Sequence, residues 1–251
     1  RLQGYTEDEY FTASDLNVYY DPDNRLWHKR PDWFLAVGVP FLSAGGDMRL
    51  SYVTWQEAVN PFVVVELISP GTEAEDLGET TAEPEAPPPK WVVYEQILQV
   101  PYYVVFNRYT DELRVFKLAA GHYQEQSLPD NRLWIPELDI GLGLWYGTYA
   151  EGTHRQTERQ WLRWYDADGQ WLMTDAELAR QRTEAERQRA EAERQRAEAE
   201  RQRAEAERQR AEAEQQKALA EQRRANDAEV QLATLKAKLR AQGIDPNGLL
   251  E

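Results

Sequence analysis

The sequence predicts an α/β domain with a mixed α+β sheet, followed by a long C-terminal α-helix with coiled-coil character. The first observation is a pair of strand-length apolar runs, at residues 63–68 and 101–107, which are rich in β-branched side chains. Such continuous runs are typical of strands buried on both faces of a sheet. The second observation is a seven-residue repeat, AEAERQR, that continues through residues 190–210 without a helix breaker.

The length of 251 residues fits one globular domain plus an extension. We expect a globular domain over residues 1–173, a helix over 174–242 and a short tail over 243–251. Because the chain begins at Arg1 rather than at Met, we expect a trimmed or partial product. It shows no charged-then-apolar leader and no apolar stretch of membrane-spanning length, so we expect a cytoplasmic protein without membrane contact.

The net charge of −15 is concentrated in the globular part. The residues before Thr183 contain 29 acids and 15 bases, and those from Thr183 onward contain 15 acids and 14 bases. This charge argues against non-specific binding of nucleic acid, but it allows a compact basic cleft or carboxylates neutralised by metal. The absence of cysteine excludes disulfides, thiolate zinc sites and a cysteine nucleophile. His28, His122 and His154 have no ligand spacing, so we expect ordinary surface or turn residues.

The N-terminal region leads up to the first candidate site residue, Asp32. The first 30 residues are rich in aromatic and acidic side chains, and Asp-Pro-Asp-Asn at 21–24 is a turn signal. Pro31 and Asp32 then precede an apolar run from Trp33 to Val39. Proline is tolerated at the first residue of a strand, so we expect Asp32 at a strand entrance.

Glu66 stands in the middle of the apolar run at residues 63–68. A carboxylate in this position is costly to desolvate and needs a strong partner. One interpretation is a strand-end glutamate that reaches solvent or pairs with a lysine or arginine. The other is a metal ligand, because a divalent cation can hold a buried carboxylate ionised.

The rest of the domain alternates short elements with loops. A proline- and glutamate-rich loop over residues 79–90 precedes a helix that we expect from about Lys90 to Gln99. After the strand at 101–107, the segments LRVFKL and HYQEQSL indicate an antiparallel meander. A last hairpin is expected around Asp168-Gly169.

Lys90 is unusual because a cation at a helix N-terminus opposes the helix macrodipole. It is either an exposed lysine of the first turn or a cation that faces carboxylates or a phosphate. Tyr94 follows four residues later and therefore lies on the same helix face. This position is equally consistent with packing in the hydrophobic core and with a place in a functional site.

The C-terminal helix is expected to begin at Thr174-Asp-Ala-Glu177, which has capping-box spacing, and to end at Gly243. Glutamate and arginine recur three and four residues apart, so ion pairs can cover its surface. The repeat has a weak coiled-coil seam of alanine and glutamate. Larger apolar residues at heptad spacing occur only near the end, at Ala225, Ala228, Leu232, Leu235 and Leu239. We favour a solvated single helix with an oligomerising tip over a full-length coiled coil.

The chain resembles the Uma-type putative restriction endonuclease family in three segments: RPDWFLAVGVP, SYVTWQEAVNPFVVVELISPGTEAEDLG and KWVVYEQILQVPYYVVFN. The family belongs to the PD-(D/E)XK nuclease superfamily, and the resemblance covers roughly residues 5–150. It implies a restriction-endonuclease-like mixed sheet flanked by helices, with Asp32 and Glu66 as Mg²⁺ ligands. The superfamily lysine is expected two residues after Glu66, where this chain has Ile68. The resemblance therefore points to Lys90, with Asp76 as a weaker candidate for a supporting role.

The implied function is a Mg²⁺- or Mn²⁺-dependent endonuclease that hydrolyses DNA, with Asp32, Glu66 and Lys90 as catalytic residues. A carboxylate-held Mg²⁺ can activate water and neutralise the transition state, and a nearby ammonium adds to the second effect. One alternative is a catalytically silent scaffold that keeps the nuclease fold and self-associates through its C-terminal helix. A further alternative is a nuclease-fold binding module that has lost catalysis.

Overall fold

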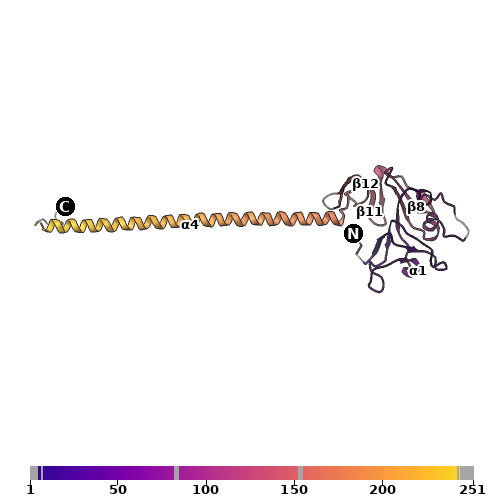
Figure 1. Ribbon diagram of the computed structural model, residues 1–251, viewed down its shortest axis with the longest axis horizontal. Helices are drawn as coiled ribbons and strands as arrows, with labels where there is room; N and C mark the ends of the chain where they lie inside the picture. Colours follow the sequence, from indigo (N-terminus) through magenta and orange to yellow (C-terminus); the bar gives the residue numbers. More distant parts are fainter. Residues whose placement is uncertain (1–4, 7, 82–84, 152–154, 242, 244–251) are drawn as a thin grey trace. The chain divides into compact units, whose positions relative to one another are not determined.

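The computed structural model describes most of the chain, namely residues 5–6, 8–81, 85–151, 155–241 and 243. The chain divides into two compact units, Arg1–Leu172 and Met173–Glu251. The strands belong to the first unit, and the long helix α4 belongs to the second (Figure 1). The predicted mixed α+β fold with a long C-terminal helix is therefore confirmed.

Six strands form the central sheet, in the order β1-β4-β6-β7-β8-β9. Their bounds are β1 Tyr10–Ser14, β4 Trp33–Val37, β6 Val63–Leu67, β7 Tyr102–Asn107, β8 Glu112–Ala119 and β9 His122–Glu125. β6 pairs in parallel with β7, and the other neighbours pair antiparallel, so the sheet is mixed. The two runs predicted as doubly buried strands are β6 and β7, and β8 and β9 form the predicted meander.

Strand β6 contributes to two hydrophobic cores, one on each face of the central sheet. Val64 and Ile68 belong to the core that also contains Tyr94, which we call the tyrosine-side core. Val65 belongs to the other core, shared with the sheet of β10, β11 and β12, which we call the hairpin-side core. Because side chains alternate along a strand, Glu66 lies on the tyrosine side with Val64.

Two smaller sheets flank the central one. The first has the order β10-β11-β12, with β10 Arg132–Ile135, β11 Ile140–Glu151 and β12 Arg155–Tyr165. The second has the order β3-β2-β5, with β2 Val18–Tyr19, β3 His28–Lys29 and β5 Tyr52–Val53. The predicted turn before β3 is confirmed, because Asp21 Oδ1 accepts hydrogen bonds from the backbone nitrogens of Asp23 and Asn24.

The hairpin expected around Asp168-Gly169 is present in a short form. A tight turn is present there, with Asp166 N donating to Gln170 O at 2.9 Å. Beyond it, an antiparallel bridge joins Tyr165 to Trp171, and Leu172 N donates to Trp164 O at 2.9 Å. In addition, β12 pairs with β11 along its whole length, which was not predicted. The longer ladder satisfies many more backbone groups than the short segment after the turn can offer.

The remaining helical segments are short. They are α1 Thr54–Glu57, α2 Glu73–Asp76, α3 Lys90–Val92, the π-helix η1 Val93–Ile97 and the 3₁₀-helix η2 Pro129–Asn131. The helix predicted from about Lys90 therefore begins where expected, but it widens into a π-turn. Leu98 N donates to Val93 O, five residues back, at 2.8 Å. Single π-turns inside helices occur frequently at functional sites.

Helix α4 spans Asp175–Ala241, and none of its residues is buried. Its predicted capping box is confirmed, since Thr174 N donates to Glu177 Oε2 at 2.8 Å and Glu177 N donates to Thr174 Oγ1 at 3.3 Å. In the described part of the chain, no helix combines the length and apolar content that crossing a membrane needs. His154 and the tail after Gly243 lie outside the described residues.

Candidate active site

Glu66 is the buried centre of the site, with only 1% of its surface exposed. Both carboxylate oxygens accept a hydrogen bond: Lys90 Nζ donates to Oε2 at 3.0 Å, and Tyr94 OH donates to Oε1 at 2.8 Å. Lys90 begins α3 and Tyr94 lies in η1, so one turn of helix supplies both donors. Pairing with a lysine, one of the two interpretations of Glu66, is thus present in the structure, and metal ligation stays a prediction.

Asp76 is the second buried carboxylate and is also 1% exposed. Lys90 Nζ donates to its Oδ1 at 2.8 Å, so a single ammonium lies between two carboxylates from different elements. Asp76 ends the short helix α2, and Tyr103 OH donates to the Asp76 backbone carbonyl at 2.9 Å. That hydrogen bond ties the end of α2 to β7, and the contact with Lys90 holds the side chain of Asp76.

The sequence made Asp76 a weaker candidate than Asp32. In the structure, however, Asp76 accepts a hydrogen bond from Lys90, as Glu66 does. Acids are frequent in this segment, at Glu73, Glu75, Asp76 and Glu79, and their spacing does not distinguish one from another. The usable signal is the next residue, Leu77, which packs against the tyrosine-side core. Leu77 anchors the end of α2, and the contact with Lys90 then accounts for the burial of the Asp76 side chain.

Glu66, Asp76, Lys90 and Tyr94 form one cluster, and their charges are strongly coupled. Burial raises the pKa of Glu66 to about 7, although Lys90 and Tyr94 act to lower it. Burial acts to lower the pKa of Lys90, but the Glu66 and Asp76 carboxylates outweigh this effect and raise the pKa above its usual value. Burial beside Glu66 also holds the pKa of Tyr94 well above its usual value. Lys90 is therefore a cation at neutral pH, while Glu66 is poised to exchange a proton.

A second ion pair extends the cluster along α2. Lys29 Nζ, from β3, contacts Glu75 Oε1 at 3.1 Å. The Lys29 side chain is 13% exposed and that of Glu75 is 39% exposed. The cluster thus contains three carboxylates and two ammonium groups drawn from four separate elements. Its dense pairing explains how so many charges are tolerated near the core.

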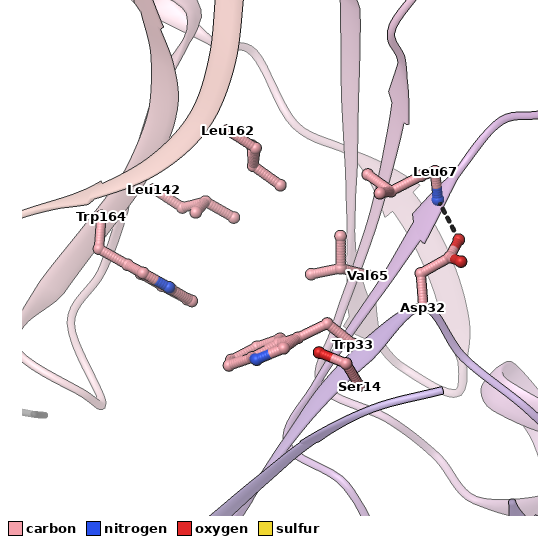
Figure 2. Close-up of a pocket in the computed structure, with 8 residues that line it drawn as sticks. All are labelled: Ser14, Asp32, Trp33, Val65, Leu67, Leu142, Leu162 and Trp164. Atoms are coloured by element: carbon pink, nitrogen blue, oxygen red, sulfur yellow. Dashed lines mark hydrogen bonds between the residues drawn. The ribbon is translucent and has the colours of Figure 1, made fainter. Parts of the chain in front are cut away.

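Asp32 directly precedes β4, at the strand entrance where it was predicted. Its Oδ2 accepts a hydrogen bond from Leu67 N at 2.6 Å (Figure 2). Since Leu67 follows Glu66, this contact keeps the Asp32 carboxylate within about 5 Å of the Glu66 Cα atom. In the described part of the chain, no hydrogen bond or ion pair joins Asp32 to Glu66 or Lys90. A metal shared by Asp32 and Glu66 therefore stays a prediction.

A cavity of about 280 Å³ lies next to Asp32 on the hairpin side of the sheet. Its lining residues are Ser14, Asp32, Trp33, Val65, Leu67, Leu142, Leu162 and Trp164. Figure 2 shows Val65 and Trp33 directed toward Leu142 and Trp164, whereas the Asp32 carboxylate is directed at the Leu67 nitrogen. The cavity is mainly apolar, so it brings no further ligating group to the cluster around Glu66.

The donor set of Glu66 and Asp76 fits a hard divalent cation. Their oxygens lie at 3.0 and 2.8 Å from the same nitrogen, so the two carboxylates already converge on one point. Mg²⁺ is typically held by one or two carboxylates together with water and substrate phosphates. Among the described residues, no three His, Asp or Glu side chains form a closed cage for a metal. The arrangement therefore suits a metal that binds together with a phosphate.

Comparison with protein-family models matches residues 1–150 to Uma2, described as "Putative restriction endonuclease". The chain belongs to the Uma2 family. The matched part of this Uma2 protein includes Asp32, Glu66, Asp76 and Lys90, and it leaves out the long helix α4. A search of curated proteins found no match to the chain. Uma2 membership indicates a nuclease-like fold, in agreement with the mixed sheet around β6 and β7.

Proposed function

We propose that this Uma2 protein is a metal-dependent endonuclease that hydrolyses phosphodiester bonds of DNA. One observation carries the proposal beyond family membership: the Lys90 ammonium is held between the buried carboxylates of Glu66 and Asp76. Two carboxylates and a lysine are sufficient for this chemistry, which needs no histidine or cysteine. The absence of cysteine and the scattered histidines are consistent with it.

Glu66 would hold Mg²⁺ or Mn²⁺ together with one further carboxylate, either Asp76 or the adjacent Asp32. When bound, such an ion makes a water molecule nucleophilic near neutral pH and neutralises negative charge on the phosphate. Asp32 enters the set through its position, because its contact with Leu67 N places it beside the backbone of Glu66. Asp76 enters it because it shares the Lys90 ammonium with Glu66.

Lys90 supplies the fixed positive charge. In hydrolysis, the oxygen of water bonds to phosphorus, the ester P–O bond breaks, and the leaving oxygen takes up a proton. Negative charge builds on the phosphate oxygens along the way, and an ammonium held in place stabilises it. The raised pKa of Lys90 keeps that ammonium protonated across the neutral range.

Exposure indicates the side from which a substrate reaches the cluster. The Lys90 side chain is 17% exposed, whereas those of Glu66 and Asp76 are 2% and 1% exposed. An approaching phosphate therefore meets the ammonium first. Binding of that phosphate would weaken the hold of Lys90 on the two carboxylates and make their oxygens available to a cation.

A scaffold without catalysis is the second candidate function, and two observations favour it. Lys90 already pairs with both buried carboxylates, so a metal is not their only source of positive charge. In addition, the large apolar side chains exposed on α4 gather toward its C-terminal end, at Leu219, Val230, Leu232 and Leu235. In this alternative, copies of the chain self-associate through the tip of α4.

The distinguishing experiment is incubation of supercoiled plasmid with the full chain in Mg²⁺, in Mn²⁺ and in EDTA. The endonuclease function predicts nicked and then linear plasmid in the presence of either metal and intact plasmid in EDTA. A preparation that is folded but inert with both metals would contradict the endonuclease and favour the scaffold.

A further inference from the structure

The sheet of β10, β11 and β12 uses only one of its faces for the core. Leu142, Leu144 and Leu162 belong to the hairpin-side core. The alternate side chains therefore point away from that core. We call this outward set the ladder face: Arg132 and Trp134 of β10, Trp145 and Tyr149 of β11, and Arg159, Trp161, Arg163 and Tyr165 of β12.

At one end of the ladder face, a guanidinium lies between two aromatic rings. The Arg132 guanidinium carbon is 4.2 Å from the centre of the Trp171 ring and 5.0 Å from the centre of the Tyr165 ring. Trp134 packs beside Tyr165, with ring centres 5.9 Å apart. Stacked guanidinium and aromatic groups attract one another through the ring quadrupole.

The same alternation continues toward the other end. Arg163 lies over Trp145 at 4.3 Å, and Arg159 lies over Trp161 at 5.7 Å. Tyr149 extends the row, with its ring centre 5.4 Å from that of Trp161. Rings and guanidinium groups therefore follow one another along most of the face.

Glycines let some of these groups lie flat against the sheet. A Cβ atom at Gly141 would approach the Tyr165 ring to 2.0 Å, and one at Gly147 would approach the Trp145 ring to 2.1 Å. Both rings thus lie directly over backbone that has no side chain of its own. Tyr165 itself is buried beneath Arg132, so the rings that remain half-buried or exposed on this face are those of Trp134, Trp145, Tyr149 and Trp161.

The charge of the ladder face is opposite to that of the domain around it. The domain as a whole is strongly acidic, with 29 acids and 15 bases before Thr183. Within β10, Gly141–Tyr149 and Thr157–Tyr165, the outward positions carry three arginines and no acid. One neighbouring acid, Asp111, is 3.9 Å from Arg159 at the edge of the face. An acidic protein that gathers cations and aromatic rings on one sheet face suits a partner with both phosphates and bases.

We propose that the ladder face binds an unpaired strand of nucleic acid, with bases stacked on the rings and phosphates beside the arginines. Stacking platforms combined with cationic grooves are the usual means of holding single strands. The choice of DNA over RNA rests on the proposed endonuclease function. The face would then hold an unpaired segment of the DNA substrate outside the cluster around Glu66.

Spacing favours an unpaired strand over a duplex. Rows on one face of a strand recur every second residue, about 6.8 Å apart. Successive nucleotides of one strand in B-DNA are separated by about 3.4 Å along the axis, and their bases are stacked inside the duplex. A single strand can stretch to the wider spacing and turn its bases toward the rings, whereas a duplex cannot.

The test is fluorescence anisotropy with the full chain in EDTA, which prevents metal-dependent cleavage. The probes are labelled oligothymidylate, labelled oligouridylate and a labelled duplex of equal length. We expect the parent to bind oligothymidylate more tightly than the duplex. Tyr149→Ala should weaken this binding about 5- to 150-fold, the range for loss of one stacked aromatic ring. Tyr149→Phe keeps the ring and should bind like the parent.

Tyr146→Ala is the matched control. Tyr146 is 61% exposed, compared with 46% for Tyr149, but it occupies an inward-alternating position of the same strand. It should leave the affinity unchanged. Arg159→Gln should reduce the slope of log affinity against log salt by about 0.7, the value for one phosphate contact on a single strand.

Several results would overturn the proposal. They are a parent that does not bind oligothymidylate, equal affinity for the duplex, or equal losses in Tyr146→Ala and Tyr149→Ala. Binding of oligouridylate without oligothymidylate would reject DNA as the ligand. This binding test is separate from the test of the endonuclease function. A parent protein that binds oligothymidylate but cleaves no plasmid would support the role of the ladder face and contradict catalysis.

Discussion

Glu66 shows how a single residue can combine burial with charge. Its strand excludes water on both sides, and the cost of desolvating a carboxylate is partly offset by Lys90 and Tyr94. The offset is incomplete, because the pKa of Glu66 still rises to about 7. The folded protein therefore retains an electrostatic cost at this residue, which a bound cation would relieve.

The first prediction concerns the stability of the metal-free protein. Because the folded-state pKa of Glu66 is about 7 and the ordinary value is 4.5, the folded state binds more protons than the unfolded state between these pH values. Its contribution to stability is thus full below pH 4.5 and is lost as the pH rises through 7. The loss amounts to at most about 3 kcal/mol.

Urea unfolding in EDTA, followed by tryptophan fluorescence, measures this effect. Glu66→Gln cannot ionise, so its stability relative to the parent should increase as the pH is raised from 5 to 8. A difference between the two proteins that stays constant over this range would show that Glu66 titrates normally.

The second prediction concerns Lys90, which pairs with two buried carboxylates. Lys90→Met should lower the free energy of unfolding by about 3–5 kcal/mol in EDTA at pH 8, the usual cost of removing one partner from a buried ion pair. Added Mg²⁺ should recover part of the loss, because a ligand of the folded state stabilises it.

Lys117→Met is the matched control for Lys90→Met. Lys117 also contacts a carboxylate, Glu137, at 3.0 Å, but its side chain is 38% exposed. Its loss should cost no more than about 1 kcal/mol, as is typical of exposed ion pairs. Equal effects of the two substitutions would contradict the special role of Lys90.

At the scale of elements, the site depends on β6, α2 and the helical segment α3–η1. β6 presents Glu66 on the tyrosine side, α2 places Asp76 over the same face, and α3–η1 brings Lys90 and Tyr94 to both. The π-turn of η1 contains Tyr94, which is fully buried. Each element is short, so its position depends on hydrogen bonds and packing with its neighbours more than on its own propensity.

Local patterns explain which elements could be predicted from the sequence. The β-branched runs of β6 and β7, the proline before Asp32 and the capping box at Thr174 each act within a few residues. The contacts of Lys90 with Glu66 and Asp76 join residues 24 and 14 positions apart. Such contacts arise only in the tertiary fold. The family resemblance indicated Lys90, but the spacing of the acids within residues 73–79 could not distinguish Asp76 from its neighbours.

The pairing of β11 with β12 was missed for a related reason. Outward positions of these strands carry tryptophan and tyrosine, as at Trp145 and Trp161, where a half-buried strand normally carries polar residues. Alternation of apolar and polar residues, the usual signal of an exposed sheet face, is therefore hidden.

Helix α4 gives the third prediction. Its middle carries the exposed ion pair of Arg208 with Glu212, at 2.9 Å, among repeated glutamates and arginines, whereas its exposed leucines and valine lie toward the C-terminal end. Salt screens exposed ion pairs but leaves apolar contacts intact. Hydrogen exchange over residues 190–210 should therefore accelerate with salt more than exchange over residues 225–240.

Truncation tests self-association by the same helix. A chain that ends after Ala179 should scatter light as a smaller species than the parent, because the apolar tip is lost. An unchanged oligomeric state would contradict self-association through α4.

At the scale of the whole molecule, an acidic domain contains a compact cluster of charges and one cationic, aromatic sheet face. The cluster is suited to phosphoryl chemistry, and the ladder face is suited to holding an unpaired strand. Self-association through α4 would place two or more such domains on one nucleic acid and raise the effective concentration of each at its site. Catalysis, strand binding and assembly are separate properties, and each can fail without the others.

Cleavage of supercoiled plasmid in Mg²⁺ by the parent, Glu66→Gln and Glu95→Gln is the most direct measurement of the central claim. Glu95 is a matched control, because it is a buried carboxylate that binds Tyr123 N and lies outside the cluster. Glu66→Gln and Asp32→Asn should lose several orders of magnitude in rate, since metal binding and water activation fail together. Lys90→Ala should fall less steeply, and Glu95→Gln should cleave like the parent. A Glu66→Gln protein that cleaves at the parental rate would contradict the assignment of the active site.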